Sequence, residues 1–102
     1  MTPQQFKDIT KWQKETFGEA TVWSKLSHLD EELAELWDDL NTNNPNRRLE
    51  WADCFLLLFG AAAADGMNYS DIVSAITEKM DINYERKWGE PDENGVVNHI
   101  KE

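Results

Sequence analysis

The chain has 102 residues, with 20 aspartates and glutamates against 10 lysines and arginines, and a formal net charge of −10. This excess of acid excludes direct binding to bare nucleic acid, because such binding depends on Lys and Arg contacts to phosphate. Hydrophobic residues make up 40% of the sequence, which excludes a disordered acidic tail and predicts one folded domain over residues 1–102. A core of this size is thin, so we expect the chain to form a homo-oligomer.

The single cysteine, Cys54, lies in an apolar run, and we interpret it as a buried free thiol rather than a reactive one. Because no disulfide can form within the chain, a reducing cytoplasm is the expected compartment. Residues 1–12 have no apolar signal core. The apolar run of residues 54–64 is shorter than the roughly 20 residues that a membrane-spanning helix needs, so we expect no membrane contact.

The sequence predicts an all-α fold with four helices, over residues 3–17, 21–41, 47–64 and 70–87, followed by a tail over residues 88–102. Thr2 is expected to cap the first helix, with Pro3 at its first position, and Gly18 to end it. In the second helix, leucines at positions 26, 29, 33, 36 and 40 form one stripe, which predicts a buried face.

The polar loop over residues 41–46 is too short for anything but a tight connection, so we expect the second and third helices to pair antiparallel. The third helix is apolar on almost every side and is expected to end at Asp65-Gly66. One chain can hardly bury such a helix, so it is expected to contribute to a subunit interface. The fourth helix is expected to begin after Ser70 as N-cap and to bury a stripe of Val73, Ile76, Met80 and Tyr84.

Acidic residues gather at two places, EELAE at 31–35 and EWAD at 50–53. At about 100° per residue, one face of the second helix carries Lys25, His28, Glu32, Glu35 and Asp39. Glu50 and Asp53 share a face one turn apart on a helix with almost no other polar side chain. An antiparallel pair of helices therefore brings together four carboxylates, Glu32, Glu35, Glu50 and Asp53.

Carboxylates clustered at the edge of a core either take up protons or bind cations. Ligands that are all oxygen favour Mg²⁺ or Mn²⁺ over zinc. A di-iron bundle is a competing interpretation, but it requires Glu-x-x-His motifs, and neither His28 nor His99 follows a glutamate by three residues. A plain solvated acidic face remains the alternative for each acid on the second helix.

Three polar residues, Lys79, Asn83 and Arg86, lie along one side of the fourth helix at positions i, i+4 and i+7. Two cations and an amide are the groups that bind the outer phosphates of a triphosphate. A solvated polar face is again the alternative interpretation.

The two acidic segments together resemble the EExxE…ExxD motif of MazG-like all-α nucleoside triphosphate pyrophosphohydrolases. The segment KMDINYERKWGEPDENGVVNH, residues 79–99, is similar to the C-terminal signature of a short subgroup of that family, which includes dATP/dGTP diphosphohydrolases. The resemblance covers roughly residues 22–101. The chain lacks the second domain of full-length MazG, so functions that depend on that domain are not implied.

The resemblance implies an enzyme that hydrolyses a (deoxy)nucleoside triphosphate, such as dATP or dGTP, to the monophosphate and pyrophosphate with Mg²⁺ or Mn²⁺, and that forms a dimer or tetramer. By position, the metal ligands are Glu32, Glu35, Glu50 and Asp53. The first glutamate of the motif, Glu31, is expected to orient the attacking water. The residues expected to contact substrate are Lys25, His28, Lys79, Asn83, Arg86 and Trp88. The phosphate-binding residues Lys79, Asn83 and Arg86 come from the same or a neighbouring subunit, and packing in the core is the alternative for Trp88.

Two other functions stay open at this point. A related pyrophosphohydrolase acting on dUTP or on a damaged nucleotide has the same motif, since base choice depends on the shape of a pocket. A non-catalytic acidic module that binds a basic partner requires only surface acids. Such a module leaves unexplained why Glu50 and Asp53 stand on an apolar helix.

Overall fold

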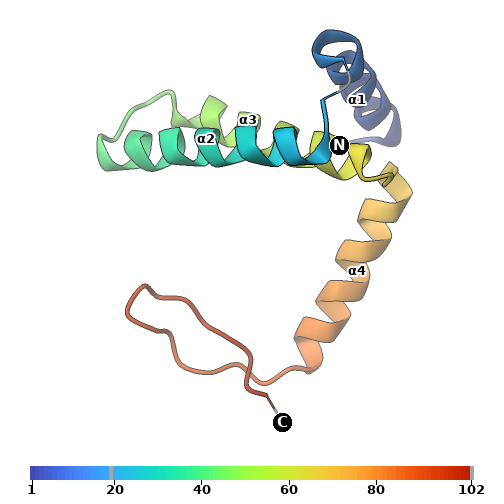
Figure 1. Cartoon of the computed structure of the whole chain (residues 1–102). Helices are drawn as coiled ribbons and strands as arrows, with labels where there is room; N and C mark the ends of the chain where they lie inside the picture. Colours follow the sequence, from blue (N-terminus) through green and yellow to red (C-terminus); the bar gives the residue numbers. More distant parts are fainter. Residues whose placement is uncertain (19, 102) are drawn as a thin grey trace. The chain divides into compact units, whose positions relative to one another are not determined.

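The computed structural model describes residues 1–18 and 20–101. This part of the chain contains four α-helices and no β-strand, which confirms the all-α prediction (Figure 1). The helices are α1 (Pro3–Phe17), α2 (Val22–Asn41), α3 (Arg47–Ala64) and α4 (Tyr69–Glu85). The chain divides into two compact units, Met1–Ile72 and Val73–Glu102, and the division falls within α4.

The ends of the first two helices follow from side-chain capping. The hydroxyl of Thr2 accepts a hydrogen bond from the Gln5 backbone N–H at 3.1 Å, and the Gln5 side chain accepts one from the Thr2 N–H at 2.8 Å. Thr21 caps α2 in the same way, since its hydroxyl accepts from the Ser24 N–H at 3.1 Å. These contacts satisfy backbone donors that have no partner inside a helix. α2 therefore begins one residue later than expected, at Val22.

The expected N-cap of α4 was wrong. The side chain of Asn68 accepts a hydrogen bond from the Asp71 N–H at 2.8 Å, and the Asp71 carboxylate accepts from the Asn68 N–H at 2.9 Å. Asn68 is therefore the cap, and Ser70 lies inside the first turn. The helix ends at Glu85, two residues before the expected end.

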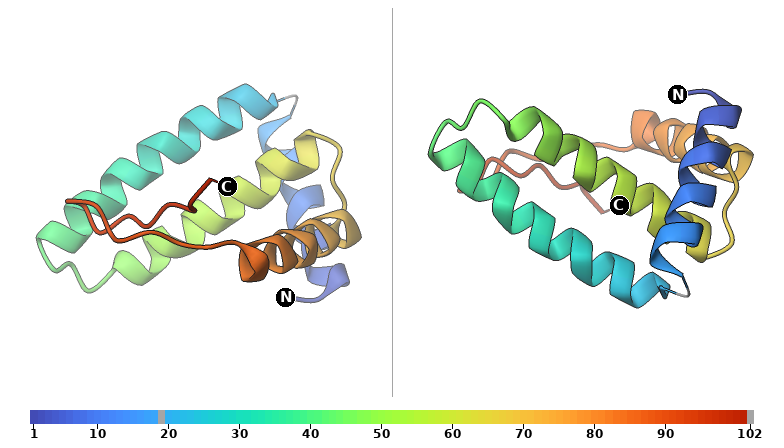
Figure 2. Two further views of the ribbon diagram at one scale, coloured as in Figure 1. Left: turned by 90° about the horizontal axis from the view of Figure 1, so that it is seen from below. Right: turned by 90° about the horizontal axis from the view of Figure 1, so that it is seen from above.

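α2 and α3 lie side by side and antiparallel in the first unit, as the short connection predicted (Figure 2). Their loop is held by its own polar side chains. The Asn44 side chain donates from Nδ2 to Oδ1 of Asp39 at 3.2 Å, and Arg47 donates to the Asn43 side chain at 2.6 Å. Asn43 has a positive φ of 52°, a conformation that asparagine tolerates better than most residues.

α1 packs on α3 through a small mixed core. The Phe6 ring, which is buried, contacts Phe59 with ring centroids 6.0 Å apart and Tyr69 with centroids 5.9 Å apart. Further along α1, the buried Gln13 donates from Nε2 to the Leu56 carbonyl at 2.9 Å. The N-terminal helix is thereby fixed by aromatic contacts at one end and a buried hydrogen bond at the other.

Much of the predicted core is uncovered within one chain. Of the α2 leucine stripe, only Leu36 is fully buried. On α3, Trp51, Phe55 and Leu58 are about half exposed, as expected for a helix that one chain can hardly bury on every side. All four residues of the expected α4 stripe are also exposed, namely Val73, Ile76, Met80 and Tyr84. A single copy of the chain thus leaves apolar surface on α2, α3 and α4 without cover.

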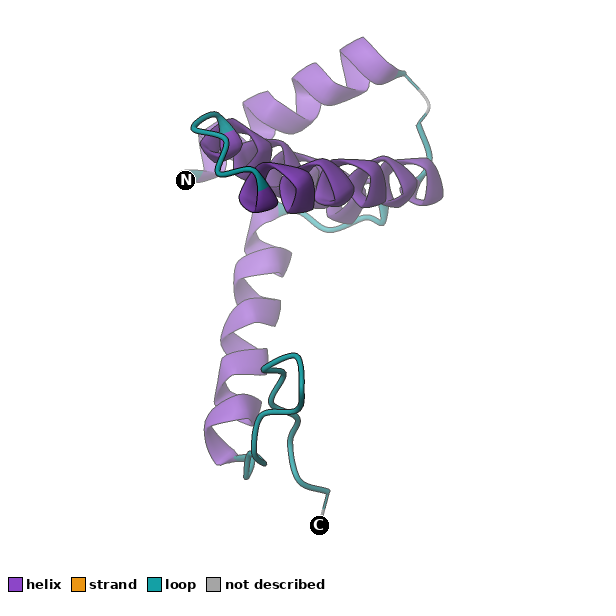
Figure 3. Ribbon diagram, turned by 90° about the vertical axis from the view of Figure 1, so that its left-hand side faces the viewer, coloured by secondary structure: helices purple, strands orange, loops and turns teal. Residues whose placement is uncertain are grey.

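The second unit consists of the rest of α4 and a tail that folds back on itself (Figure 3). Trp88 and His99 pair as an isolated antiparallel bridge. Next to them, the Gly89 N–H donates to the Asn98 carbonyl at 2.9 Å, and the Ile100 N–H donates to the Lys87 carbonyl at 2.7 Å. The tail is therefore an ordered hairpin. In the described part of the chain, no helix is long and apolar enough to cross a membrane.

Candidate metal centre

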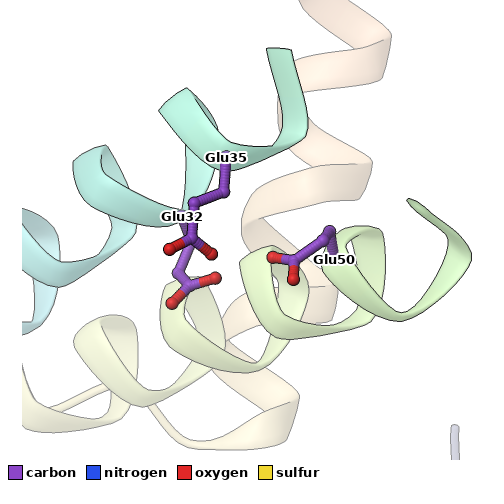
Figure 4. A group of neighbouring side chains, drawn as sticks. All are labelled: Glu32, Glu35 and Glu50. Atoms are coloured by element: carbon purple, nitrogen blue, oxygen red, sulfur yellow. The ribbon is translucent and has the colours of Figure 1, made fainter. Parts of the chain in front are cut away.

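Three carboxylates meet between α2 and α3. Glu32 and Glu35 stand one turn apart on α2, and Glu50 stands in the first turns of α3 (Figure 4). One oxygen from each lies within 4.8 Å of the others, which is a spacing that a single cation can bridge. Glu32 and Glu50 are half-buried, whereas Glu35 is exposed. The antiparallel hairpin of α2 and α3 creates this cluster, because it places two distant segments of the sequence opposite each other.

The carboxylates of the cluster act on one another electrostatically. The pKa of Glu50 is raised above its ordinary value of 4.5, chiefly because its carboxyl shares a hydrogen bond with Glu32. Desolvation and the charges of Glu32, Asp53 and Asp39 raise it further. In addition, Oε2 of Glu50 is buried and has no hydrogen-bond partner among the described residues. A bound divalent cation would satisfy this oxygen and offset most of the negative charge of the three carboxylates, so the residues fit a metal ion.

Two other acids of the motif lie outside the triad of Glu32, Glu35 and Glu50. Asp53 is exposed, and its carboxylate is not among the oxygens that meet, although its charge acts on Glu50. Glu31 is also exposed, next to Glu32 in sequence but outside the cluster of oxygens. The structure therefore brings together three of the four predicted ligands in the absence of an ion.

Cys54 lies close to the carboxylates and is buried, as the sequence predicted. Its pKa is raised by burial and by the charges of Glu32, Glu50 and Asp53. Since the thiolate is the reactive form, both effects keep this thiol inert at neutral pH.

Lys25 and His28 lie beside the triad on α2. Nε2 of His28 is 3.4 Å from Oε1 of Glu32, one turn further along the helix. Both side chains line a cavity of about 190 Å³ whose apolar walls include Phe17 and Leu57. The cavity was not expected from sequence, because it depends on how the end of α1 packs against α3. Its lining therefore contains the ring of Phe17, the ammonium group of Lys25 and the imidazole of His28, close to the carboxylates.

The predicted phosphate-binding residues belong to the second unit. Lys79 on α4 is exposed, Asn83 on α4 is half-buried, and Arg86, also half-buried, directly follows the last residue of the helix. Oδ1 of Asn83 is buried and has no hydrogen-bond partner among the residues described. The Trp88 indole N–H donates to the Asn83 carbonyl at 3.1 Å, and its ring is 45% exposed. Trp88 is thus fastened to the end of α4 and is not a core residue.

A protein-family model described as dATP/dGTP pyrophosphohydrolase matches residues 5–102. The chain belongs to this family. The matched region includes α1, the triad, the stripe on α4 and the tail.

Two phage proteins are similar to this member of the dATP/dGTP pyrophosphohydrolase family. A dATP/dGTP diphosphohydrolase of Salmonella phage PMBT28 is 34% identical over 94 residues, which are 92% of this chain and 30% of that protein. The Eaa protein of Salmonella phage P22 is 41% identical over 59 residues, which are 58% of this chain and 19% of that protein. The chain thus spans less than a third of the length of either relative.

A solved structure covers the whole chain. It is the cyanophage S-2L MazG-like pyrophosphohydrolase bound to dGDP and three catalytic Mn²⁺ ions per active site. The alignment covers 100% of this chain and 96% of that one, with a TM-score of 0.83 and 26% sequence identity. The four-helix chain is therefore a MazG-like domain, as the acidic motif indicated.

Proposed function

We propose that the chain hydrolyses a purine deoxynucleoside triphosphate, dATP or dGTP, to the monophosphate and pyrophosphate. The observation that carries this proposal is the triad of Glu32, Glu35 and Glu50, assembled from two helices with one unsatisfied buried oxygen. The family match and the dGDP-bound, Mn²⁺-bound structural neighbour support the same reaction and substrate class.

The resident metal is Mg²⁺ or Mn²⁺, held by Glu32, Glu35 and Glu50, with Asp53 as a fourth ligand. All these ligands offer carboxylate oxygens, which suit both ions. A divalent ion at this place neutralises phosphate charge and activates water for attack. Asp53 stands one turn after Glu50 on the same helix, and its charge acts on Glu50, which supports its assignment as the fourth ligand. Glu31, at the outer side of the cluster, is proposed to orient the water.

The nucleoside part of the substrate is proposed to occupy the cavity beside the triad. Phe17 and Leu57 offer apolar surface to a flat base, and Lys25 and His28 offer hydrogen-bond donors. The position of His28 next to Glu32 joins this cavity to the carboxylates. A base held here lies near the proposed metal ions.

The phosphates are proposed to contact Lys79, Asn83 and Arg86 of the second unit. The Nδ2 amide of Asn83 can donate to a phosphate oxygen, and Arg86 supplies a planar fork of N–H donors. Trp88 holds the end of this stripe through its bond to the Asn83 carbonyl.

We also propose a homo-oligomer, a dimer or a tetramer. Trp51, Phe55 and Leu58 leave α3 with an apolar face that no described residue of the chain covers. Burying apolar surface stabilises an assembly by about 25 cal/mol per Å². A second copy of the chain is the simplest cover for this face.

The cytoplasm is the compartment that we propose for this activity. Cys54 is a buried, unpaired thiol, which is typical of proteins in a reducing environment. The proposed substrate is also a cytoplasmic nucleotide.

The test is pyrophosphate release from a panel of dNTPs and NTPs, each assayed with Mn²⁺, with Mg²⁺ and with EDTA. We expect EDTA-sensitive release of pyrophosphate and an equal amount of monophosphate, with dATP or dGTP ranked first. If dUTP gave the most pyrophosphate, the proposed substrate would be wrong but the proposed reaction would stand. No release from any nucleotide by a folded protein with bound Mn²⁺ would overturn the proposal.

A further inference from the structure

The second unit contains a small basic hollow that the stripe on α4 does not account for. It has a volume of about 410 Å³ and is lined by Glu85, Arg86, Lys87, His99, Ile100 and Lys101. Residues 73–101 contain four lysines and arginines, and three of them line this hollow. We refer to these six residues as the tail cup.

The backbone hairpin is what assembles the tail cup. The bridge between Trp88 and His99, and the hydrogen bond from the Ile100 N–H to the Lys87 carbonyl, return the end of the tail to the end of α4. The His99 ring also packs edge-on against Trp88, with centroids 6.3 Å apart at 83°. His99 and Lys101 are thereby brought beside Arg86, from which they are far apart in sequence.

A simpler role explains only half of this arrangement. Cations just after a helix stabilise the partial negative charge of its C-terminal carbonyls, and Arg86 and Lys87 are placed to do so. That effect does not require the tail to fold back to the end of α4. His99 and Lys101 add two more cationic or protonatable groups to a place where Glu85 is the only acid among the described lining residues.

The charge and size of the tail cup select its ligand. Arginine, lysine and protonated histidine donate hydrogen bonds to phosphate oxygens, and bonds between charged partners are the strong ones. A hollow of about 410 Å³ has room for a small anion, and the net charge of −10 repels a polyanion that spreads beyond it. A small, highly charged anion with several oxygens fits best.

We infer that the tail cup is a binding site for a diphosphate group, in which His99 and Lys101 act with Arg86. This inference rests on the proposed function, which supplies such a group as the leaving pyrophosphate. It assigns a binding role to the hairpin, and adds His99 and Lys101 to the residues expected to contact phosphate.

The test is titration of inorganic pyrophosphate into the protein by calorimetry, in EDTA and without divalent ions. The test variant is His99→Gln with Lys101→Ala, and its fold is checked by circular dichroism. We expect pyrophosphate to bind at least about tenfold more weakly to this variant than to the wild type, because two charge-assisted hydrogen bonds are lost. The control is Lys7→Ala, which removes one positive charge from α1, and it should retain the wild-type affinity.

A second measurement needs no variant. The chain has two histidines, His28 beside the carboxylates and His99 in the tail cup. In NMR spectra of the wild type, pyrophosphate should shift the ring signals of His99 and leave those of His28 in place. Orthophosphate at the same concentration should shift them less.

Three outcomes would overturn the inference: equal affinity of variant and wild type, an equal loss in the Lys7→Ala control, or shifts of His28 alone. These outcomes are separate from failure of the proposed function, because binding is measured without metal or turnover. Pyrophosphate bound at the tail cup by a protein that hydrolyses no nucleotide would overturn the proposed function alone.

Discussion

The carboxylates of Glu32 and Glu50 face each other from neighbouring antiparallel helices, with oxygens within 4.8 Å. Their hydrogen bond exists only while one of them holds a proton, which is why the pKa of Glu50 is raised. Two like charges at this distance are unfavourable in a folded protein unless a proton or a cation lies between them. The protein therefore keeps an arrangement that is costly without a ligand, and this is the physical basis of the predictions below.

Glu32→Gln should abolish turnover and preserve the fold. The substitution keeps the shape of the side chain but removes a charged ligand, and the loss of metal-dependent stabilisation should lower kcat by about 100-fold or more. Asp30→Asn is the matched control, since Asp30 is an exposed acid on the same helix, outside the triad. Retained activity in a folded Glu32→Gln protein would contradict the site assignment.

Glu50→Gln should stabilise the metal-free protein at neutral pH. Because its pKa is higher in the folded state than its ordinary 4.5, the folded state binds more protons than the unfolded state just above pH 4.5. The stability of the metal-free wild type should therefore fall as the pH rises through this window. The glutamine variant should lack this fall, so its Tm should exceed that of the wild type at pH 7 and approach it at pH 4.

Metal binding should reverse the order of the Tm values at pH 7, so that the wild type becomes more stable than the Glu50→Gln variant. Mn²⁺ should raise the Tm of the wild type at pH 7, because a ligand that binds only the folded state stabilises it. The Glu50→Gln variant should gain much less, while Asp30→Asn should respond like the wild type. An equal Mn²⁺ response in all three proteins, measured by differential scanning calorimetry, would place the ion elsewhere.

Gly60→Ala should loosen the packing of α1 on α3 and reshape the cavity beside the triad. A Cβ at position 60 would lie 2.8 Å from Oε1 of Gln13, a buried side chain whose Nε2 is held by the Leu56 carbonyl. We expect a loss of about 1–3 kcal/mol in the free energy of unfolding, measured with urea. Adding Gln13→Ala removes the clash, so the double variant should lose less than the sum of the two single changes. Simple additivity would show that the two residues do not interact.

Phe55→Lys should weaken the proposed oligomer. Phe55 is 56% exposed on the uncovered face of α3, so a charge there costs a single chain little. Buried between two copies, the same charge is strongly unfavourable. Light scattering after size-exclusion chromatography should show a smaller species, while Thr16→Lys, at an exposed polar position of α1, should leave the mass unchanged. An unaltered mass for Phe55→Lys would exclude this face from the interface.

The sequence by itself determined the helices and the chemistry of the acidic motif. Apolar periodicity and capping residues are local properties, so α1 and α3 have the predicted ends, and the error at Ser70 came from a competing cap two residues earlier at Asn68. The short loop before Arg47 allows little besides an antiparallel pair. That geometry made the meeting of Glu32, Glu35 and Glu50 predictable.

Tertiary structure decided what depends on contacts between distant segments. The cavity beside His28 requires Gln13 of α1 to pack against Gly60, and no pattern within one helix encodes that contact. The tail cup depends on the backbone bridge that brings His99 next to Trp88. The sequence shows only a histidine that follows Gly89 and Gly95, which does not predict this bridge. The uncovered faces of α2 and α4 likewise emerged only in three dimensions, because periodicity shows which side of a helix is apolar and not whether one chain suffices to bury it. The uncovered face of α3 was expected, because that helix is apolar on almost every side.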